Sequence, residues 1–220
     1  MSPLLRVLAL AWLAYVLPGD RVVGMLAETR ASRTPLHVEA RLSARDSKAP
    51  TSLVIELHPD LGARVWDEKG GRWLLAGGKA TAGTVLPAPA WVPDLAPLVM
   101  RRESELRGWL GSEGVDAQQN DLARCGDGDC WVLGGRAGSG QLWIQKPALE
   151  LRRLVQGKVT RASYDDWQAF GKIRFPKRIE LADDSGSVAT LTVDSVSAIT
   201  LGAAELSPGW VQASPAAKAR

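Results

Sequence analysis

The chain has 220 residues, of which 45% are hydrophobic, and its 27 lysines and arginines nearly balance 24 aspartates and glutamates. This length and composition suit one folded domain of the larger all-β or α+β kind and exclude a largely disordered chain. The basic residues are scattered instead of gathered in a stripe, so we expect no binding to nucleic acid.

The first nineteen residues form a candidate export segment. Arg6 precedes an apolar run from Val7 to Leu17, which suits the core of a signal peptide and is shorter than the roughly 20 residues of a membrane-spanning helix. Pro18 breaks the run, but no small-residue cleavage motif lies just before Asp20. We expect residues 1–19 to be a signal peptide or an N-terminal anchor and the protein to be periplasmic. A buried N-terminal helix is the alternative.

A short helix and then an antiparallel sheet are predicted after this segment. Asp20 can cap the helix. From Leu36 to Arg45 apolar and polar residues alternate strictly, as in a strand with one buried and one solvent-facing side. Residues 53–57, 62–67 and 72–76 continue the pattern with turns between them, which indicates an antiparallel meander.

A helical insert is predicted in the middle of the chain, at about residues 94–124. Asp94 can cap a helix that runs to about Leu110, and the polar stretch that follows is compatible with a second short helix. The apolar side chains of the first helix fall on one stripe: Leu95, Leu98, Val99, Leu106, Trp109 and Leu110. We expect this stripe to act as a movable cover over the apolar face of the sheet.

Strands are predicted again from Cys130 onward, with a hairpin turn at residues 183–186. The chain after residue 206 looks frayed, so residues 207–220 are expected to be a flexible tail. Residues 20–206 are therefore expected to form a single domain.

The two cysteines of the chain, Cys125 and Cys130, enclose the turn-forming residues Gly-Asp-Gly-Asp. One cysteine pair in an exported protein is most simply a disulfide. A structural zinc site needs four ligands, and no histidine lies near these cysteines. We expect a local disulfide that contributes little to global stability, because the loop it closes is very short.

The predicted elements combine into a mainly β, α+β fold. A one-sided antiparallel sheet must cover its apolar face, and only the helices can do so. We therefore expect an unclosed half-barrel with helices across its concave face. Nine tryptophans suit a generous core or an apolar cavity. The cavity lining is predicted to comprise Trp66, Trp73, Leu95, Leu98, Val99, Leu106, Trp109 and Trp143.

No residue set in the sequence indicates catalysis. The two histidines, His37 and His58, are not accompanied by a recognisable nucleophile motif, and no phosphate-binding glycine loop occurs. The acidic pair Asp165–Asp166 occupies adjacent strand positions, whose side chains point to opposite faces. We expect no enzymatic activity, no cofactor and no metal site.

Several strand and turn motifs in the second half resemble those of a known family. They are Gln141-Leu142-Trp143-Ile144, Leu151-Arg152-Arg153-Leu154, Tyr164-Asp165-Asp166-Trp167 and the run from Ile173 to Glu180. Over about residues 115–195 the chain resembles outer-membrane lipoprotein-sorting proteins of the LolA/LolB type. The resemblance implies an unclosed β-barrel whose helices cover a cavity for acyl chains.

The resulting functional expectation is a monomeric, periplasmic, non-enzymatic carrier. Its expected partners are lipids or lipoprotein acyl chains, with an envelope protein as a further candidate partner. The alternative is an envelope interaction or stress-sensor domain of the same fold, in which the protein's own side chains fill the cavity.

Overall fold

The computed structural model describes residues 16–30, 32–44, 49–76, 79–82, 91–136, 140–182 and 188–212. Most of the expected export segment, the turn at 183–186 and residues 213–220 lie outside these ranges.

Twelve strands of the described chain form one antiparallel sheet in the order β5-β4-β3-β2-β1-β12-β11-β10-β9-β8-β7-β6. Their bounds are β1 Leu36–Ala44, β2 Thr51–His58, β3 Gly62–Asp67, β4 Arg72–Ala76, β5 Lys79–Ala82, β6 Asn120–Cys125, β7 Gly128–Leu133, β8 Gly140–Gln145, β9 Glu150–Gln156, β10 Val159–Phe170, β11 Ile173–Ala182 and β12 Val188–Ala198. Strands β5 and β6 end the sheet and do not pair with each other, so the sheet is unclosed. The mainly β, α+β class with a large unclosed sheet is confirmed.

The first strand shows why the alternating sequence forms this sheet. In β1 the buried residues Leu36, Val38 and Ala40 point to the covered face. Arg41 points to the other face, where its Nε lies 2.8 Å from the Asp194 carboxylate of β12. Strand β1 pairs with both β2 and β12, so the first and last strands of the domain meet in the middle of the sheet.

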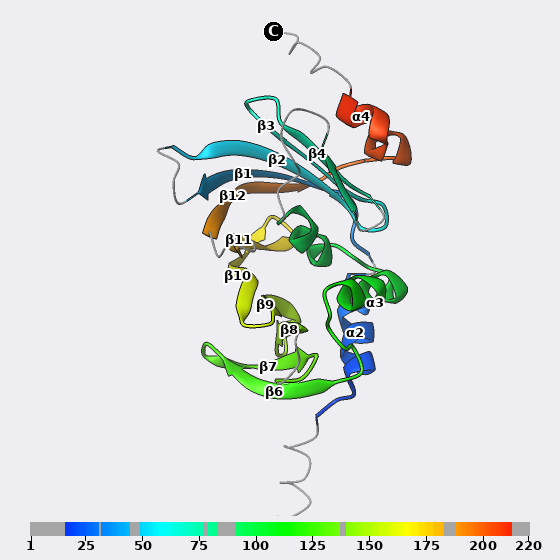
Figure 1. Ribbon diagram of the computed structural model, residues 1–220, viewed down its shortest axis with the longest axis vertical. Helices are drawn as coiled ribbons and strands as arrows, with labels where there is room; N and C mark the ends of the chain where they lie inside the picture. Colours follow the sequence, from blue (N-terminus) through cyan, green and yellow to red (C-terminus); the bar gives the residue numbers. More distant parts are fainter. Residues whose placement is uncertain are drawn as a thin grey trace, which may run out of the picture.

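Three helical segments cover the concave face: α2 (Gly19–Glu28), the 3₁₀ helix η1 (Val92–Leu98) and α3 (Glu103–Ser112). Figure 1 shows α2 and α3 side by side along one flank of the sheet, while η1 lies inside its curve. Arg107 of α3 forms an ion pair with Asp20 of α2 and another, at 2.6 Å, with Glu103 of its own helix. The predicted short helix is confirmed, but Asp20 does not cap it, because the helix begins at Gly19 with Pro18 at the N-cap position.

The single helix predicted over 94–110 is wrong, because the chain forms two helices there. Pro97 lies inside η1 and has no N–H to donate, so it disfavours an α-helix at this point. Arg102 is extended, and a new helix begins at Glu103 with acidic residues in its first turn, where the helix dipole favours them. The predicted insert is also too long, since residues 120–124 belong to strand β6.

The C-terminal segment covers the outer face of the sheet. Helices η2 (Ala203–Leu206) and α4 (Pro208–Gln212) follow β12. Leu74 of β4 is 2% exposed because it packs against Leu206 and Val211. The tail predicted from residue 207 is therefore wrong for 208–212, because the outward-facing Leu74 requires an apolar cover.

The predicted disulfide is present. Cys125 ends β6 and Cys130 lies in β7, and the bond joins the two strands beside their shared turn. Their Cα atoms are 5.8 Å apart.

Candidate functional site: an apolar pocket between α3 and the turn after β2

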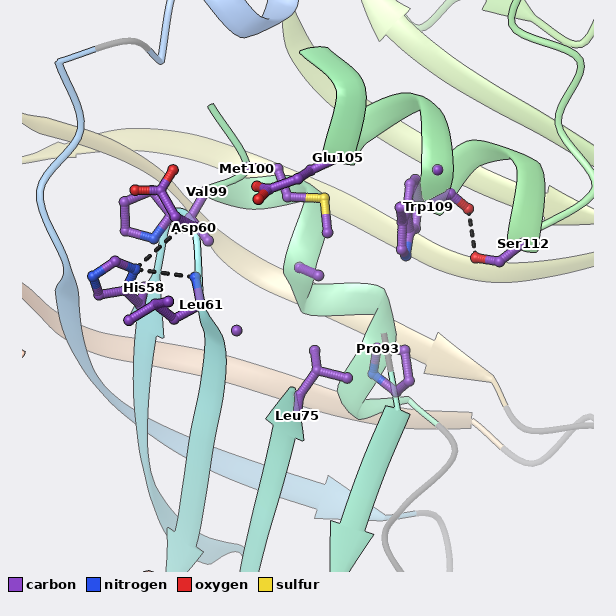
Figure 2. Close-up of a pocket in the computed structure, with 14 residues that line it drawn as sticks. His58, Asp60, Leu61, Leu75, Pro93, Val99, Met100, Glu105, Trp109 and Ser112 are labelled. Carbon is purple, nitrogen blue, oxygen red and sulfur yellow. Dashed lines mark hydrogen bonds between the residues drawn. The ribbon is translucent and has the colours of Figure 1, made fainter. Parts of the chain in front are cut away.

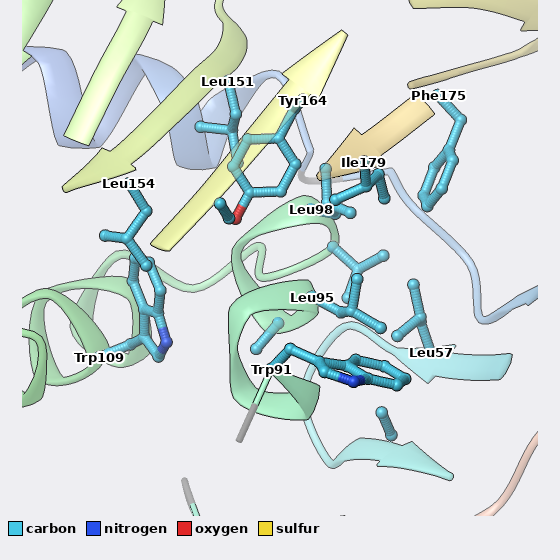
Figure 3. Close-up of a cluster of buried hydrophobic side chains, with 14 of the residues drawn as sticks. Leu57, Trp91, Leu95, Leu98, Trp109, Leu151, Leu154, Tyr164, Phe175 and Ile179 are labelled. Carbon is cyan, nitrogen blue, oxygen red and sulfur yellow. The ribbon is translucent and has the colours of Figure 1, made fainter. Parts of the chain in front are cut away.

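The concave face beneath η1 is filled by the protein's own side chains. Leu95 and Leu98 of η1 are 1% and 0% exposed. Figure 3 shows them among Leu57, Tyr164 and Ile179 of the sheet. This part of the space between helix and sheet is an ordinary packed core.

Polar side chains also tie η1 in place. Arg30 and Arg33, which follow α2, donate to the carbonyl oxygens of Pro97 and Leu98. The Tyr164 hydroxyl donates to the Asp94 carbonyl oxygen at 2.6 Å. Carbonyls at a helix C-terminus have no partner within the helix, so the two arginines satisfy groups that burial would otherwise leave unpaired. Burial raises the pKa of the Tyr164 hydroxyl, which therefore stays protonated as a donor.

A pocket of about 460 Å³ opens next to this packed region. It lies between the turn that joins β2 to β3, the helix η1 and the helix α3 (Figure 2). The turn and β4 contribute His58, Pro59, Asp60, Leu61, Gly62 and Leu75, while the helical segments contribute Pro93, Ala96, Val99, Met100, Glu105, Gly108, Trp109 and Ser112. The walls are therefore largely apolar, with polar groups at a few positions.

The pocket exists because one face of α3 carries small or polar residues. Glu105, Gly108, Trp109 and Ser112 are spaced so that they share a helix face. A Cβ atom placed on Gly108 would meet nothing within 4 Å. Trp109 is the single large apolar side chain on this face, and it forms one wall instead of filling the space.

Charged groups at the edge of the pocket neutralise one another. The Nε atoms of Arg101 and Arg102 lie 2.9 and 3.0 Å from Asp60 Oδ1, and Arg102 also pairs with Glu105 at 3.1 Å. The Asp60 side chain is only 8% exposed. Hydrogen bonds from Arg101 lower the pKa of this carboxyl below its usual value. Burial raises the pKa of Glu105.

His58 has a structural role in the same turn. Its Nδ1 accepts hydrogen bonds from the backbone N–H groups of Asp60 and Leu61, at 3.0 and 3.1 Å. Nδ1 therefore carries no proton, and burial lowers the pKa of the ring. His37 lies outside this pocket, with Nδ1 at 3.2 Å from Glu56 Oε1 and its ring centroid 6.5 Å from that of Trp66. Neither histidine adjoins a nucleophile in the contacts of the described residues.

The predicted cavity residues are divided among three places. Val99 and Trp109 line the pocket. Trp73, Leu95, Leu98 and Leu106 are buried in the main core instead. Their placement reflects tight packing beneath the helices.

The prediction is wrong for Trp66 and Trp143, which lie on the outer face of the sheet. Trp66 contacts Trp210, with ring centroids 5.8 Å apart. The guanidinium carbon of Arg153 lies over the ring of Trp143, 5.4 Å from the centroid of that ring. The signal was present in the sequence, because each tryptophan directly follows or precedes a buried strand residue, such as Val65, and neighbours point to opposite faces.

Sequence reasoning missed the turn after β2, together with Leu75, Pro93 and Met100. No local pattern marks them, because the pocket joins segments far apart in the chain. In the described ranges, no group of three or more His, Cys, Asp or Glu residues could hold a metal ion. No helix among these residues is long and apolar enough to cross a membrane.

Comparison with known proteins places this arrangement in a structural class. No protein-family model matches the sequence, and no curated protein is significantly similar to it. A LolA superfamily protein from Nitrosomonas europaea matches in structure with a TM-score of 0.55 and 13% identity, over 89% of this chain and all of that one (100%). The chain therefore shares its fold with this LolA superfamily protein.

Two further solved structures share this LolA-type fold. A protein of the DUF1329 family from Desulfovibrio piger has a TM-score of 0.54 and 10% identity, over 88% of this chain and 98% of that one. A Vibrio parahaemolyticus domain, named an outer-membrane lipoprotein-sorting protein domain, has a TM-score of 0.55 and 8% identity, over 88% and 100% of the two chains. Because the sequence identities are only 8–13%, the structural likeness establishes the fold alone. This is the fold that the sequence motifs suggested.

Proposed function

We propose that this protein is a periplasmic, non-enzymatic carrier that binds a lipid or a lipoprotein acyl chain in the pocket beside α3. The apolar pocket of about 460 Å³ is the observation that carries the proposal. The LolA-type fold supports it, since one structural neighbour is named for lipoprotein sorting. Export through residues 1–19 and a monomeric state are parts of the same proposal.

The size of the pocket suits one acyl chain. A water molecule occupies about 30 Å³ in the liquid, and a methylene group is of similar size. The pocket therefore has room for roughly fifteen methylene-sized groups. Each buried methylene stabilises a complex by about 0.8 kcal/mol. An acyl chain of ordinary length could therefore bind without a charged recognition group.

The expected occupant can be sought directly. Protein purified from intact cells should carry co-purifying lipids in mass spectrometry, and delipidated protein should bind a fluorescent fatty acid. Failure of both measurements would remove the carrier proposal.

A matched pair of variants tests whether the bound chain occupies this pocket. Gly108 lines the pocket, whereas Gly111 lies one turn further along α3 and outside the lining, and an added Cβ meets nothing within 4 Å at either position. Gly108→Leu should therefore weaken fatty-acid binding strongly, while Gly111→Leu leaves it unchanged. Equal effects of the two substitutions would place the ligand elsewhere.

A second candidate function is an envelope interaction or sensor domain that holds no ligand. The packed core beneath η1, with Leu98 fully buried and Tyr164 bonded to Asp94, favours it. In that case the pocket would contain only water, and the outer face of the sheet would be the place to look for a protein partner. An empty protein that fails to bind fatty acid but is captured by one envelope protein would support this second candidate.

A further inference from the structure

The pocket contains one buried hydrogen-bond donor without a partner. Trp109 is 6% exposed, and its indole Nε1 makes no hydrogen bond to any of the described residues. Among the residues that line the pocket, no other buried side-chain nitrogen or oxygen of the described chain is unsatisfied in this way. An indole N–H can only donate, so its natural partner is an oxygen acceptor.

The nitrogen faces the pocket. Figure 2 shows it at the end of the Trp109 ring that is directed toward the space above Leu75 and Pro93. The polar groups of the turn, His58 and Asp60, lie at the opposite side of the pocket in the same view.

The other polar groups of the pocket already have partners inside the protein. Asp60 is paired with Arg101 and Arg102, and His58 Nδ1 accepts from two backbone N–H groups. The Ser112 hydroxyl donates to the Trp109 carbonyl oxygen at 2.7 Å. Trp109 Nε1 is therefore the buried donor that remains for an incoming molecule.

We infer that the pocket takes an oxygen-bearing acyl compound, such as a fatty acid or an acyl ester, whose oxygen accepts a hydrogen bond from Trp109 Nε1. This inference rests on the proposed function and adds the need for an oxygen acceptor and the residue that recognises it. A plain hydrocarbon offers this buried N–H no acceptor and leaves it unsatisfied. An oxygen at the same place would gain one hydrogen bond that a hydrocarbon cannot make.

Two ligands of equal length separate this contact from simple burial. Methyl decanoate carries an ester, and dodecane has methylene groups in its place. Their affinities can be measured by displacement of a naphthylamine dye from wild-type protein and from Trp109→Phe, which keeps an aromatic ring but removes the N–H. For each ligand, the affinity for Trp109→Phe is divided by the affinity for wild-type protein. Comparing the two ratios cancels the difference in hydrophobicity between the ligands.

Trp109→Phe should weaken binding of the ester by about 2- to 12-fold more than binding of the alkane, the range expected from one net hydrogen bond. Trp73→Phe is the matched control, because Trp73 is equally buried, at 6% exposed, but lies outside the pocket lining. It should change both affinities by the same factor. Melting temperatures of both variants show whether they remain folded.

The infrared spectrum gives a second measurement on the wild-type protein itself. A carbonyl that accepts a hydrogen bond absorbs at lower frequency, so the band of bound methyl decanoate should lie below its position in hydrocarbon solvent. Equal losses of ester and alkane in Trp109→Phe, or an unshifted carbonyl band, would overturn the inference while leaving the carrier proposal intact. If neither ligand displaces the dye from wild-type protein, the proposed function fails, and the inference fails with it.

Discussion

Two neighbouring parts of the space between helices and sheet differ sharply. Beneath η1, Leu95 and Leu98 interdigitate with the sheet, and hydrogen bonds from Arg30 and Tyr164 hold the helix backbone. Beside α3, a short helix face with Gly108 and Ser112 leaves a pocket of about 460 Å³.

The difference shows that the helices do not form one uniform cover. The η1 part is fixed by apolar packing and by bonds to its carbonyl groups. The α3 part contacts the turn after β2 through ion pairs at the pocket edge, between Asp60 and both Arg101 and Arg102. An opening motion, if ligand entry needs one, is therefore expected at α3 and not at η1.

The largest expected effect is on the packed side. Leu98→Ala removes a fully buried side chain from the core and should lower the free energy of unfolding by about 2–5 kcal/mol. Met100→Ala is the matched change in the pocket wall, where the side chain is only partly buried, and it should cost less than half as much. Urea unfolding measures both values. Similar costs would mean that the two regions are equally well packed.

Tyr164→Phe tests the hydrogen bond that the Tyr164 hydroxyl donates to the backbone of η1. The substitution keeps the ring but leaves the Asp94 carbonyl oxygen without the 2.6 Å donor, so the free energy of unfolding should fall by about 1–3 kcal/mol. Fatty-acid binding should be unchanged, because Tyr164 does not line the pocket. A loss of binding with unchanged stability would mean that the shape of the pocket depends on this hydrogen bond.

Asp60→Asn tests the ion pairs at the pocket edge. The free energy of unfolding near pH 7 should fall by about 1–2 kcal/mol, a modest value because the Arg102 side chain is 55% exposed and partly screened. The pKa of Asp60 is lowered in the folded state, so its stabilisation is complete above the unfolded value, near 3.9, and disappears as pH falls through the folded value.

Stability measured at several pH values should therefore show wild-type and Asp60→Asn protein converging at acid pH. Arg41→Gln is the matched change at an exposed pair, since it removes the ion pair with Asp194 on the opposite face of the sheet. It should lower stability less at pH 7 and also converge with wild type at acid pH, because Arg41 lowers the pKa of Asp194. A difference between wild type and Asp60→Asn that persists at low pH would assign the effect to packing instead of charge.

The smallest expected effect concerns α3 itself. Gly111→Ala should raise the free energy of unfolding by about 0.5–1 kcal/mol, because alanine favours the helix and an added Cβ meets nothing within 4 Å. Fatty-acid affinity should stay the same, since Gly111 is outside the pocket lining. Calorimetry and dye binding measure the two quantities, and weaker binding would show that the pocket depends on flexibility of α3.

Local sequence patterns determined much of the fold. The alternation in residues 36–45 identified β1 and its buried face, and the short spacing of Cys125 and Cys130 identified their disulfide. These features depend on neighbours in the chain, whose geometry a strand or a turn imposes directly. Family-like motifs after residue 115 extended this to the LolA-type fold.

Only the tertiary structure decided where the pocket lies and which tryptophan belongs to it. Trp66, Trp73 and Trp109 are alike as sequence signals, yet one lies on the outer face, one is in the core and one lines the pocket. The pocket needs α3 to stand opposite a turn more than forty residues earlier in the chain, as the Asp60–Arg102 pair reflects. Such distant pairing follows from the curvature of the sheet and the break after η1, which no local periodicity encodes.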